Sequence, residues 1–150
     1  MKFYVDTSVW GGYFDKEFSE WTIPFIEQIQ RGEIIAVVSN ITLAEIQSAP
    51  VSVRSLIANI PESFLEITSL TPEQEKLAKQ YIKEGALSKK FESDAFHIAI
   101  TTSLKVDSLV SWNFKHMVNF FRIRQYNSIN LKYGYSTIDI RTPKEVTYEK

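Results

Sequence analysis

Short continuous runs of apolar residues alternate along the chain with longer stretches of helical spacing. The short runs are abruptly ended and prone to extended structure, which predicts strands at Lys2–Asp6, Ile34–Val38, Phe64–Ile67, Ser108–Ser111 and Thr137–Ile140. A continuous apolar run is typical of a strand that is buried on both faces, as in a parallel sheet. These runs therefore predict the strands of a buried central sheet.

Apolar residues between these runs recur at the spacing of helix faces. Gly11-Gly12 is expected to break the chain, Asn40 to cap one helix, and Thr71 to cap another in a capping box with Gln74. The predicted helices are Phe18–Arg31, Asn40–Ile46, Val51–Asn59, Pro72–Glu84, Ser88–Lys105 and Phe114–Tyr126. Strands that alternate with helices predict an α/β fold, a three-layer α/β/α arrangement with a mostly parallel central sheet. Because no repeat or linker interrupts the pattern, we expect residues 1–150 to form one domain.

Composition excludes several kinds of protein. The 150 residues include no cysteine, which rules out disulfides, zinc–thiolate sites and thiol catalysis and fits a reducing, cytoplasmic location. No stretch approaches the roughly 20 apolar residues that a membrane span needs, so no membrane association is expected.

The distribution of charge says more than the net charge of −1. Residues 1–75 carry 4 basic and 11 acidic side chains, whereas residues 76–150 carry 13 basic and 7 acidic ones. Between Trp112 and Gly134 there are 4 basic side chains, 6 Trp, Phe or Tyr residues and no acid. Cations interleaved with aromatics suit a single-stranded nucleic acid. The alternative is an amphipathic helix with core aromatics, which we prefer for most of the rings.

Four polar residues stand where a parallel sheet would place a site, beyond the carboxyl ends of its strands. Asp6 ends the first strand, Glu45 lies one turn into the helix after the second, and Asn113 follows Ser108–Ser111. Asp94 lies on an apolar helix face, where an acid is costly to bury unless it is paired or bound to a cation. Each alone has an ordinary role in a turn or a helix, but together they share one edge of the sheet.

These residues lie in four segments whose order, spacing and context resemble a PIN domain. The segments are Val5-Asp6-Thr7-Ser8, Leu43-Ala44-Glu45-Ile46, Ser93–Ala99 and Leu109–Phe114, and the resemblance extends to about residue 143. It implies a metal-dependent nuclease acting on RNA, with Mg²⁺ or Mn²⁺ held by catalytic residues Asp6, Glu45, Asp94 and Asn113. Many bacterial members are VapC-like toxins of type II toxin–antitoxin systems, which implies a small antitoxin partner and a homodimer.

The chain departs from the family at Asn113, where an Asp is usual. The amide can still offer its carbonyl oxygen, but the lost charge should weaken a second metal site or leave it bound through water. Asp107 lies at the other end of the same strand and is not expected to replace the missing acid.

Neighbouring residues supply candidate supporting groups. The hydroxyls of Ser8 and Ser111 could orient carboxylates or a water, whereas Thr7 is expected only to cap a turn. We expect His97 to be a hydrogen-bonded core residue and His116 to lie on the surface, and neither has the spacing of a zinc site. The candidate RNA-binding cations are Lys89, Lys90, Lys115, Arg122 and Arg124.

Three functions compete. The leading prediction is a toxin-like, metal-dependent endoribonuclease. A catalytically weak or inactive PIN-fold module that binds RNA or a protein partner is the alternative, kept open by Asn113. A phosphotransfer enzyme with Asp6 as acceptor is disfavoured, because Val5 and Thr7 supply no second acid beside it.

Overall fold

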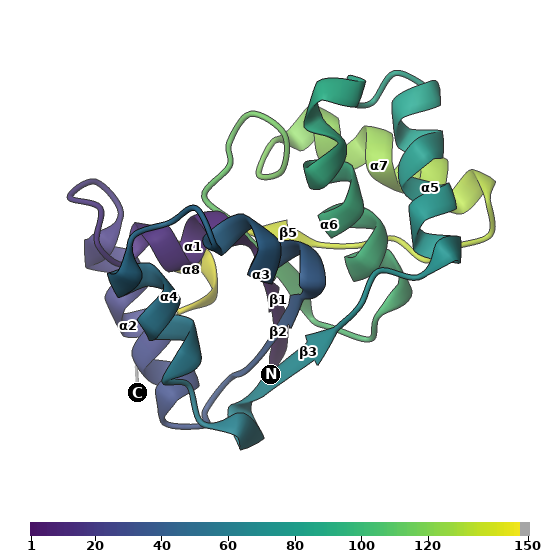
Figure 1. The fold of residues 1–150 in the computed structure, drawn as a ribbon. Coiled ribbons are helices and arrows are strands. Elements are labelled where there is room, and N and C mark those ends of the chain that lie inside the picture. The colour runs from purple at the N-terminus through teal and green to yellow at the C-terminus, as the bar shows by residue number, and fades with distance from the viewer. Residues whose placement is uncertain (148–150) are drawn as a thin grey trace.

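A five-stranded, all-parallel sheet forms the centre of the computed structural model, which describes residues 1–147 (Figure 1). The strands are β1 (Lys2–Val5), β2 (Ile35–Ser39), β3 (Leu65–Thr68), β4 (Ser108–Val110) and β5 (Ile140–Arg141). They lie in the order β3-β2-β1-β4-β5, with every pair parallel. The predicted parallel sheet is confirmed, although β5 is shorter than expected and begins only at Ile140, the last residue of the predicted strand.

Helices cover both faces of the sheet, because alternate strand residues point to opposite sides. In β1, Phe3 and Val5 enter one apolar cluster and Tyr4 enters the other. On the first face lie α1 (Thr7–Gly12), α2 (Ser19–Gln30), α4 (Val51–Ala58) and α8 (Pro143–Val146), and on the second α5 (Pro72–Lys83), α6 (Glu92–Ser103) and α7 (Phe120–Lys132) (Figure 1). This is the three-layer α/β/α arrangement that the sequence predicts.

The chain turns sharply from β2 into α3 (Asn40–Ile46). The cap of this helix is Ser39 and not Asn40, since the Ser39 hydroxyl accepts hydrogen bonds from the N–H groups of Ile41 and Thr42. Asn40 instead accepts a hydrogen bond from the backbone N–H of Leu70. Because the helix starts directly at the end of the strand, Glu45 stays close to the sheet edge.

Gly11-Gly12 closes a short helix that the sequence analysis does not predict: α1 ends at Gly12, so the chain breaks just after the two glycines. A Cβ atom at Gly12 would stand 2.9 Å from Cδ1 of Trp112 and 3.0 Å from the hydroxyl of Thr22. The glycine therefore marks a close approach of the helix to the Trp112 ring.

Two predicted helices begin later than expected. The pattern at Ser88–Lys105 divides into a 3-10 turn at Lys89–Phe91 and α6. Helix α7 starts at Phe120 and not at Phe114, with the Asn119 side chain as its cap. The intervening loop, residues 111–119, follows β4 directly.

The order of the strands creates a topological switch point at β1. β1 lies between β2 and β4, so the chain continues from β1 to one side and returns later on the other. Such a switch point opens a crevice at the carboxyl ends of the strands, where α/β proteins bind ligands. Among the residues that the structure describes, no helix is long and apolar enough to cross a membrane.

Candidate active site

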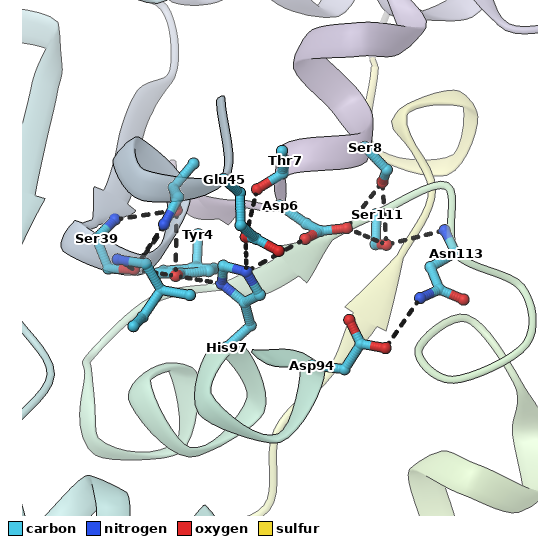
Figure 2. A network of polar contacts seen from close by, with 12 residues as sticks. Tyr4, Asp6, Thr7, Ser8, Ser39, Glu45, Asp94, His97, Ser111 and Asn113 are labelled. Atoms are coloured by element: carbon cyan, nitrogen blue, oxygen red, sulfur yellow. Dashed lines mark hydrogen bonds and ion pairs between the residues drawn. The ribbon is translucent and has the colours of Figure 1, made fainter. Parts of the chain in front are cut away.

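Asp6 occupies the switch point of the sheet and is 5% exposed. Its backbone N–H continues the ladder with β4 by donating to Val110 O at 3.0 Å. The hydroxyls of Ser8 and Ser111 each donate to Asp6 Oδ2 at 2.8 Å (Figure 2). Both predicted supporting hydroxyls thus contact the carboxylate, and they fix one of its two oxygens.

Glu45 reaches the same edge from α3. Its Oε1 accepts a hydrogen bond from Thr7 Oγ1 at 2.8 Å and lies 2.6 Å from His97 Nε2. Burial raises the pKa of Glu45, but the hydrogen bond and charge of His97, together with the Thr7 hydroxyl, outweigh it and lower that pKa overall. Glu45 is therefore held as a carboxylate, and Thr7 orients it, contrary to the prediction that Thr7 only caps a turn.

Asp94 points from the first turn of α6 toward Asp6 (Figure 2). Its Oδ2 lies 2.8 Å from His116 Nδ1 and 3.5 Å from Asn113 Nδ2. Burial raises the pKa of Asp94, and the negative charge of Asp6 raises it further against the opposing effect of His116. The two acids are thus close enough to repel each other.

His97 lies between two of the carboxylates. Its Nε2 is 2.6 Å from Glu45 Oε1 and 3.8 Å from Asp6 Oδ1, while its Nδ1 is 2.6 Å from the Tyr4 hydroxyl. The Tyr4 hydroxyl continues the chain of hydrogen bonds to Ser39 Oγ at 2.8 Å. His97 is the buried, hydrogen-bonded residue that the sequence predicts, but it also belongs to the site.

The surroundings of His97 favour its charged form. Burial lowers the pKa of this imidazole, but the hydrogen bond to Glu45 and the negative potential of Tyr4, Asp6 and Glu45 raise it to about 10. These contacts favour a protonated imidazole between the two carboxylates, which would reduce their mutual repulsion.

Asn113 shapes the loop that follows β4. Its side-chain Oδ1 accepts hydrogen bonds from the N–H groups of Lys115 and His116 at 3.1 and 3.0 Å. Its own N–H donates to Ser111 Oγ at 2.9 Å. The amide oxygen, the only side-chain atom that could act as a ligand, is thus already engaged by the turn.

His116 is buried at 4% exposure, so its predicted surface position is wrong. Its ring packs on Phe91 with centroids 4.0 Å apart, and its Nδ1 faces Asp94. Asp107, in contrast, lies at the opposite end of β4, where it accepts a hydrogen bond from the backbone N–H of Lys2 at 2.8 Å. As expected from the sequence, it stays away from the site.

The predicted RNA-binding cations separate into two groups. Lys90 and Lys115 place their ammonium groups 5.7 and 5.4 Å from the ring centroid of Phe91, next to the Asp94–His116 pair, and exposed Lys89 belongs to the same 3-10 turn as Lys90. Arg124 lies further along α7, exposed, with its guanidinium 5.6 Å from the ring of Phe120. Arg122 donates a hydrogen bond to the backbone oxygen of Ala86 and so ties α7 to the segment before α6.

Most aromatic residues of this region are exposed, contrary to our preference for core positions. Trp112 and Tyr126 are buried, whereas Phe114, Phe120, Phe121 and Tyr133 are 50, 67, 75 and 42% exposed. The rings of Phe120 and Phe121 stand edge to face at 5.4 Å. Exposed rings beside cations therefore occur at the start of α7, one loop away from Asp94.

The three carboxylates fit a hard divalent cation in their chemistry, since Mg²⁺ and Mn²⁺ prefer oxygen ligands. Each has one oxygen that accepts no hydrogen bond from the described residues: Asp6 Oδ1, Glu45 Oε2 and Asp94 Oδ1. As placed, however, no three His, Asp or Glu side chains within residues 1–147 come together closely enough to hold a metal ion. The donor set fits, while the His97 imidazole occupies the position between Asp6 and Glu45.

Fold and site together define a parallel α/β protein with one buried and two half-buried acids at the switch point of its sheet. The profile of the PIN domain family matches residues 3–111. The chain therefore belongs to the PIN domain family, whose members are nucleases.

Solved structures show the same fold. VapBC2 from Rickettsia felis, bound to a DNA fragment from its own promoter, matches with a TM-score of 0.60 and 16% identity, covering 95% of this chain and 98% of that one. The sarcin–ricin loop cleaving toxin VapC20 of Mycobacterium tuberculosis matches with a TM-score of 0.58 and 13% identity, covering 77% of this chain and 92% of that one. No curated protein matches the sequence.

Proposed function

We propose that this protein is a metal-dependent endoribonuclease that hydrolyses phosphodiester bonds of RNA, and that residues 1–150 act as one domain. The observation that carries the proposal is the convergence of Asp6, Glu45 and Asp94 from three separate elements, each with one carboxylate oxygen left without a hydrogen bond from the described residues. Carboxylates gathered in a partly buried site are costly unless cations compensate them. His97 faces Asp6 and Glu45, and a metal ion would compensate the charge that remains, that of Asp94 included.

Asp6, Glu45 and Asp94 would hold a single Mg²⁺ or Mn²⁺ ion. When bound, such an ion activates a water and stabilises the departing oxygen of a phosphodiester. Two of the three carboxylates are already oriented by hydroxyl groups, Asp6 by Ser8 and Ser111 and Glu45 by Thr7, and metal binding would draw the three acids closer together. We assign one ion and not two because the oxygen of Asn113 is engaged in its turn.

A single strand of RNA would approach along the loop 111–119. Lys89, Lys90 and Lys115 would meet phosphates next to Asp94. Arg124 and the exposed rings of Phe120 and Phe121 would continue the path, because cations bind the backbone and rings stack on bases. Arg122 contributes by holding α7 in place.

The family resemblance extends the proposal to partners and location. We propose a toxin-like role in the cytoplasm, a small antitoxin protein that blocks the site, and a homodimer. The structural likeness to VapBC2 and VapC20 supports this proposal only through the shared fold. Light scattering on the purified protein measures the dimer directly.

The decisive experiment is cleavage of a mixed set of single-stranded RNAs in Mg²⁺, in Mn²⁺ and in EDTA. We expect cleavage only with metal, and a loss of at least about 100-fold in rate for Asp6→Asn, since triad-like groups acting as a unit contribute on that scale. The matched control is Asp107→Asn, which changes an acid at the opposite end of β4 and should cleave normally.

Absence of cleavage in every metal by folded protein would overturn the nuclease proposal. The catalytically weak or inactive PIN-fold module, binding RNA or a protein partner, would then take its place. The observation that favours this second function is Asn113, where the family usually has an acid and where this chain uses the side chain to build a turn.

A further inference from the structure

The loop 111–119 is built around Asn113. Besides the two hydrogen bonds to its side-chain oxygen, its backbone oxygen accepts from the N–H groups of Met117 and Val118 at 3.1 and 2.9 Å. Four N–H groups of the next five residues thus converge on Asn113. A residue with a short side-chain acceptor is the type that closes such a turn.

The residue that this turn presents to the site is His116. Its backbone oxygen accepts a hydrogen bond from Tyr126 Oη at 2.6 Å, which anchors it to α7. Its ring packs on Phe91, and its Nδ1 lies 2.8 Å from Asp94 Oδ2. The backbone contact anchors the residue, and the ring lies between Phe91 and Asp94 with Nδ1 toward the carboxylate.

The contact with His116 makes the two Asp94 oxygens different. Oδ2 is taken by His116, and Oδ1 accepts no hydrogen bond from residues 1–147. Without His116, only the long 3.5 Å contact from Asn113 Nδ2 would hold the Asp94 side chain against the repulsion from Asp6. Groups that orient a metal-binding side chain typically change metal affinity or activity by about 10–100-fold.

We infer that His116 is a positioning residue of the nuclease site: it holds Asp94 through Nδ1, and Asn113 serves to present it. The inference rests on the proposed metal-dependent function. It assigns Asn113 a role in place of the missing fourth acid, and it names a residue that the spacing of the acids does not reveal. Its rival is a purely structural role, in which the His116 ring only fills space beside Phe91.

Two substitutions distinguish the effect of the His116 hydrogen bond from the effect of its ring packing. His116→Asn keeps an N–H donor near the position of Nδ1 and loses the ring, whereas His116→Phe keeps the ring and loses the donor. The measurement is Mn²⁺ affinity by titration calorimetry, with melting temperature in EDTA and RNA affinity in EDTA recorded for each protein. We expect His116→Asn to bind Mn²⁺ within a few-fold of wild type and His116→Phe to bind about 10–100-fold more weakly.

The outcomes are distinct. Wild-type Mn²⁺ affinity in His116→Phe, or a loss in both variants that follows their loss of melting temperature, would leave the ring as a space filler and overturn the inference alone. A wild-type protein that binds no Mn²⁺ would overturn the proposed function and the inference with it. Unchanged RNA affinity in EDTA for His116→Phe would show that the substitution acts through Asp94 and not through the neighbouring Lys115.

Discussion

Polar contacts between residues far apart in sequence hold several side chains of this molecule in place. Tyr81 in α5 is an example from the second face of the sheet, since its hydroxyl lies 3.2 Å from Thr102 Oγ1 and donates to Asn130 Oδ1. The side chain is fully buried. It joins α5, α6 and α7 into one layer, and α6 and α7 are the helices that frame Asp94 and the loop 111–119.

The ionisation of Tyr81 gives a prediction about alkaline pH. Burial raises the pKa of Tyr81 far above its ordinary value, against the smaller opposing effects of Thr102 and Asn130. Since the folded pKa is raised, this group's contribution to stability is complete below the unfolded value of about 10 and is lost as pH rises above it. The free energy of unfolding in urea should therefore fall more steeply between pH 9 and 11 in wild type than in Tyr81→Phe.

Parallel slopes for the two proteins would contradict that assignment. Tyr81→Phe will be less stable at neutral pH because Asn130 loses its donor, so the comparison uses the slope and not the absolute value.

The residues of the site differ in how far sequence predicts them. Asp6 and Ser111 follow strands directly and Glu45 lies in the helix that starts where β2 ends, so their meeting at one edge follows from a parallel sheet. Tyr4 and His116 are different, because their roles depend on contacts that no spacing encodes. Tyr4 meets His97 across 93 positions, and His116 turns inward only because Asn113 folds the loop back.

Glycines with positive φ follow the ends of several helices, and two of them, Gly32 and Gly85, can be compared directly. Gly32 follows α2 with φ +77°, and a Cβ atom there would stand 2.6 Å from the Phe64 ring. Gly85 follows α5 with φ +83°, but a Cβ atom there would meet nothing within 4 Å. Both positions use the left-handed backbone that glycine adopts most easily.

Substitution by alanine should therefore cost different amounts. Gly85→Ala carries only the backbone cost of about 1 kcal/mol, whereas Gly32→Ala adds roughly 1–3 kcal/mol for displacing the Phe64 ring. Urea unfolding of the two variants measures this difference. Equal losses of stability would mean that the Phe64 ring moves aside freely.

Helix α7 allows a test of the proposed RNA path. Phe121, 75% exposed near its start, and Leu131, 63% exposed near its end, are both apolar and both dispensable for the core. Phe121→Ser should weaken single-stranded RNA binding by about 10-fold, because stacking on a base is worth about 1–3 kcal/mol. Leu131→Ser should bind RNA as wild type does. Fluorescence anisotropy in EDTA measures both, and a loss in Leu131→Ser equal to that in Phe121→Ser would place the RNA elsewhere.

The elements themselves were largely predictable, and the errors share one cause. The spacing of apolar residues identifies a helix. It does not identify the residue at which the helix begins, because that depends on side chains that bind the first backbone N–H groups. The Asn113 turn takes up residues that otherwise read as the start of α7, and Ser39 caps α3 one position before Asn40. The short helix α1, which ends at Gly12, also goes unpredicted, and the close approach of Gly12 to the Trp112 ring is not visible in the sequence.

At the scale of the whole molecule, strand order explains why residues so far apart meet. With β1 between β2 and β4, the carboxyl end of the first strand is flanked by the segment that carries Glu45 and by the loop that carries Asn113. Helix α6, packed on the second face, brings Asp94 to the same edge. A sheet with its first strand at an edge would leave Asp6 without one of these neighbours.

This placement of β1 has a consequence for how the protein is made. The neighbour β4 and the turn from Asn113 to His116 are synthesised more than 100 residues after the first strand. Until then Asp6 lacks the Ser111 hydroxyl, and Asp94 lacks its imidazole partner. Translation thus completes the site last, and a chain released early, or cut at any point before residue 108, carries Asp6 but has no assembled active site.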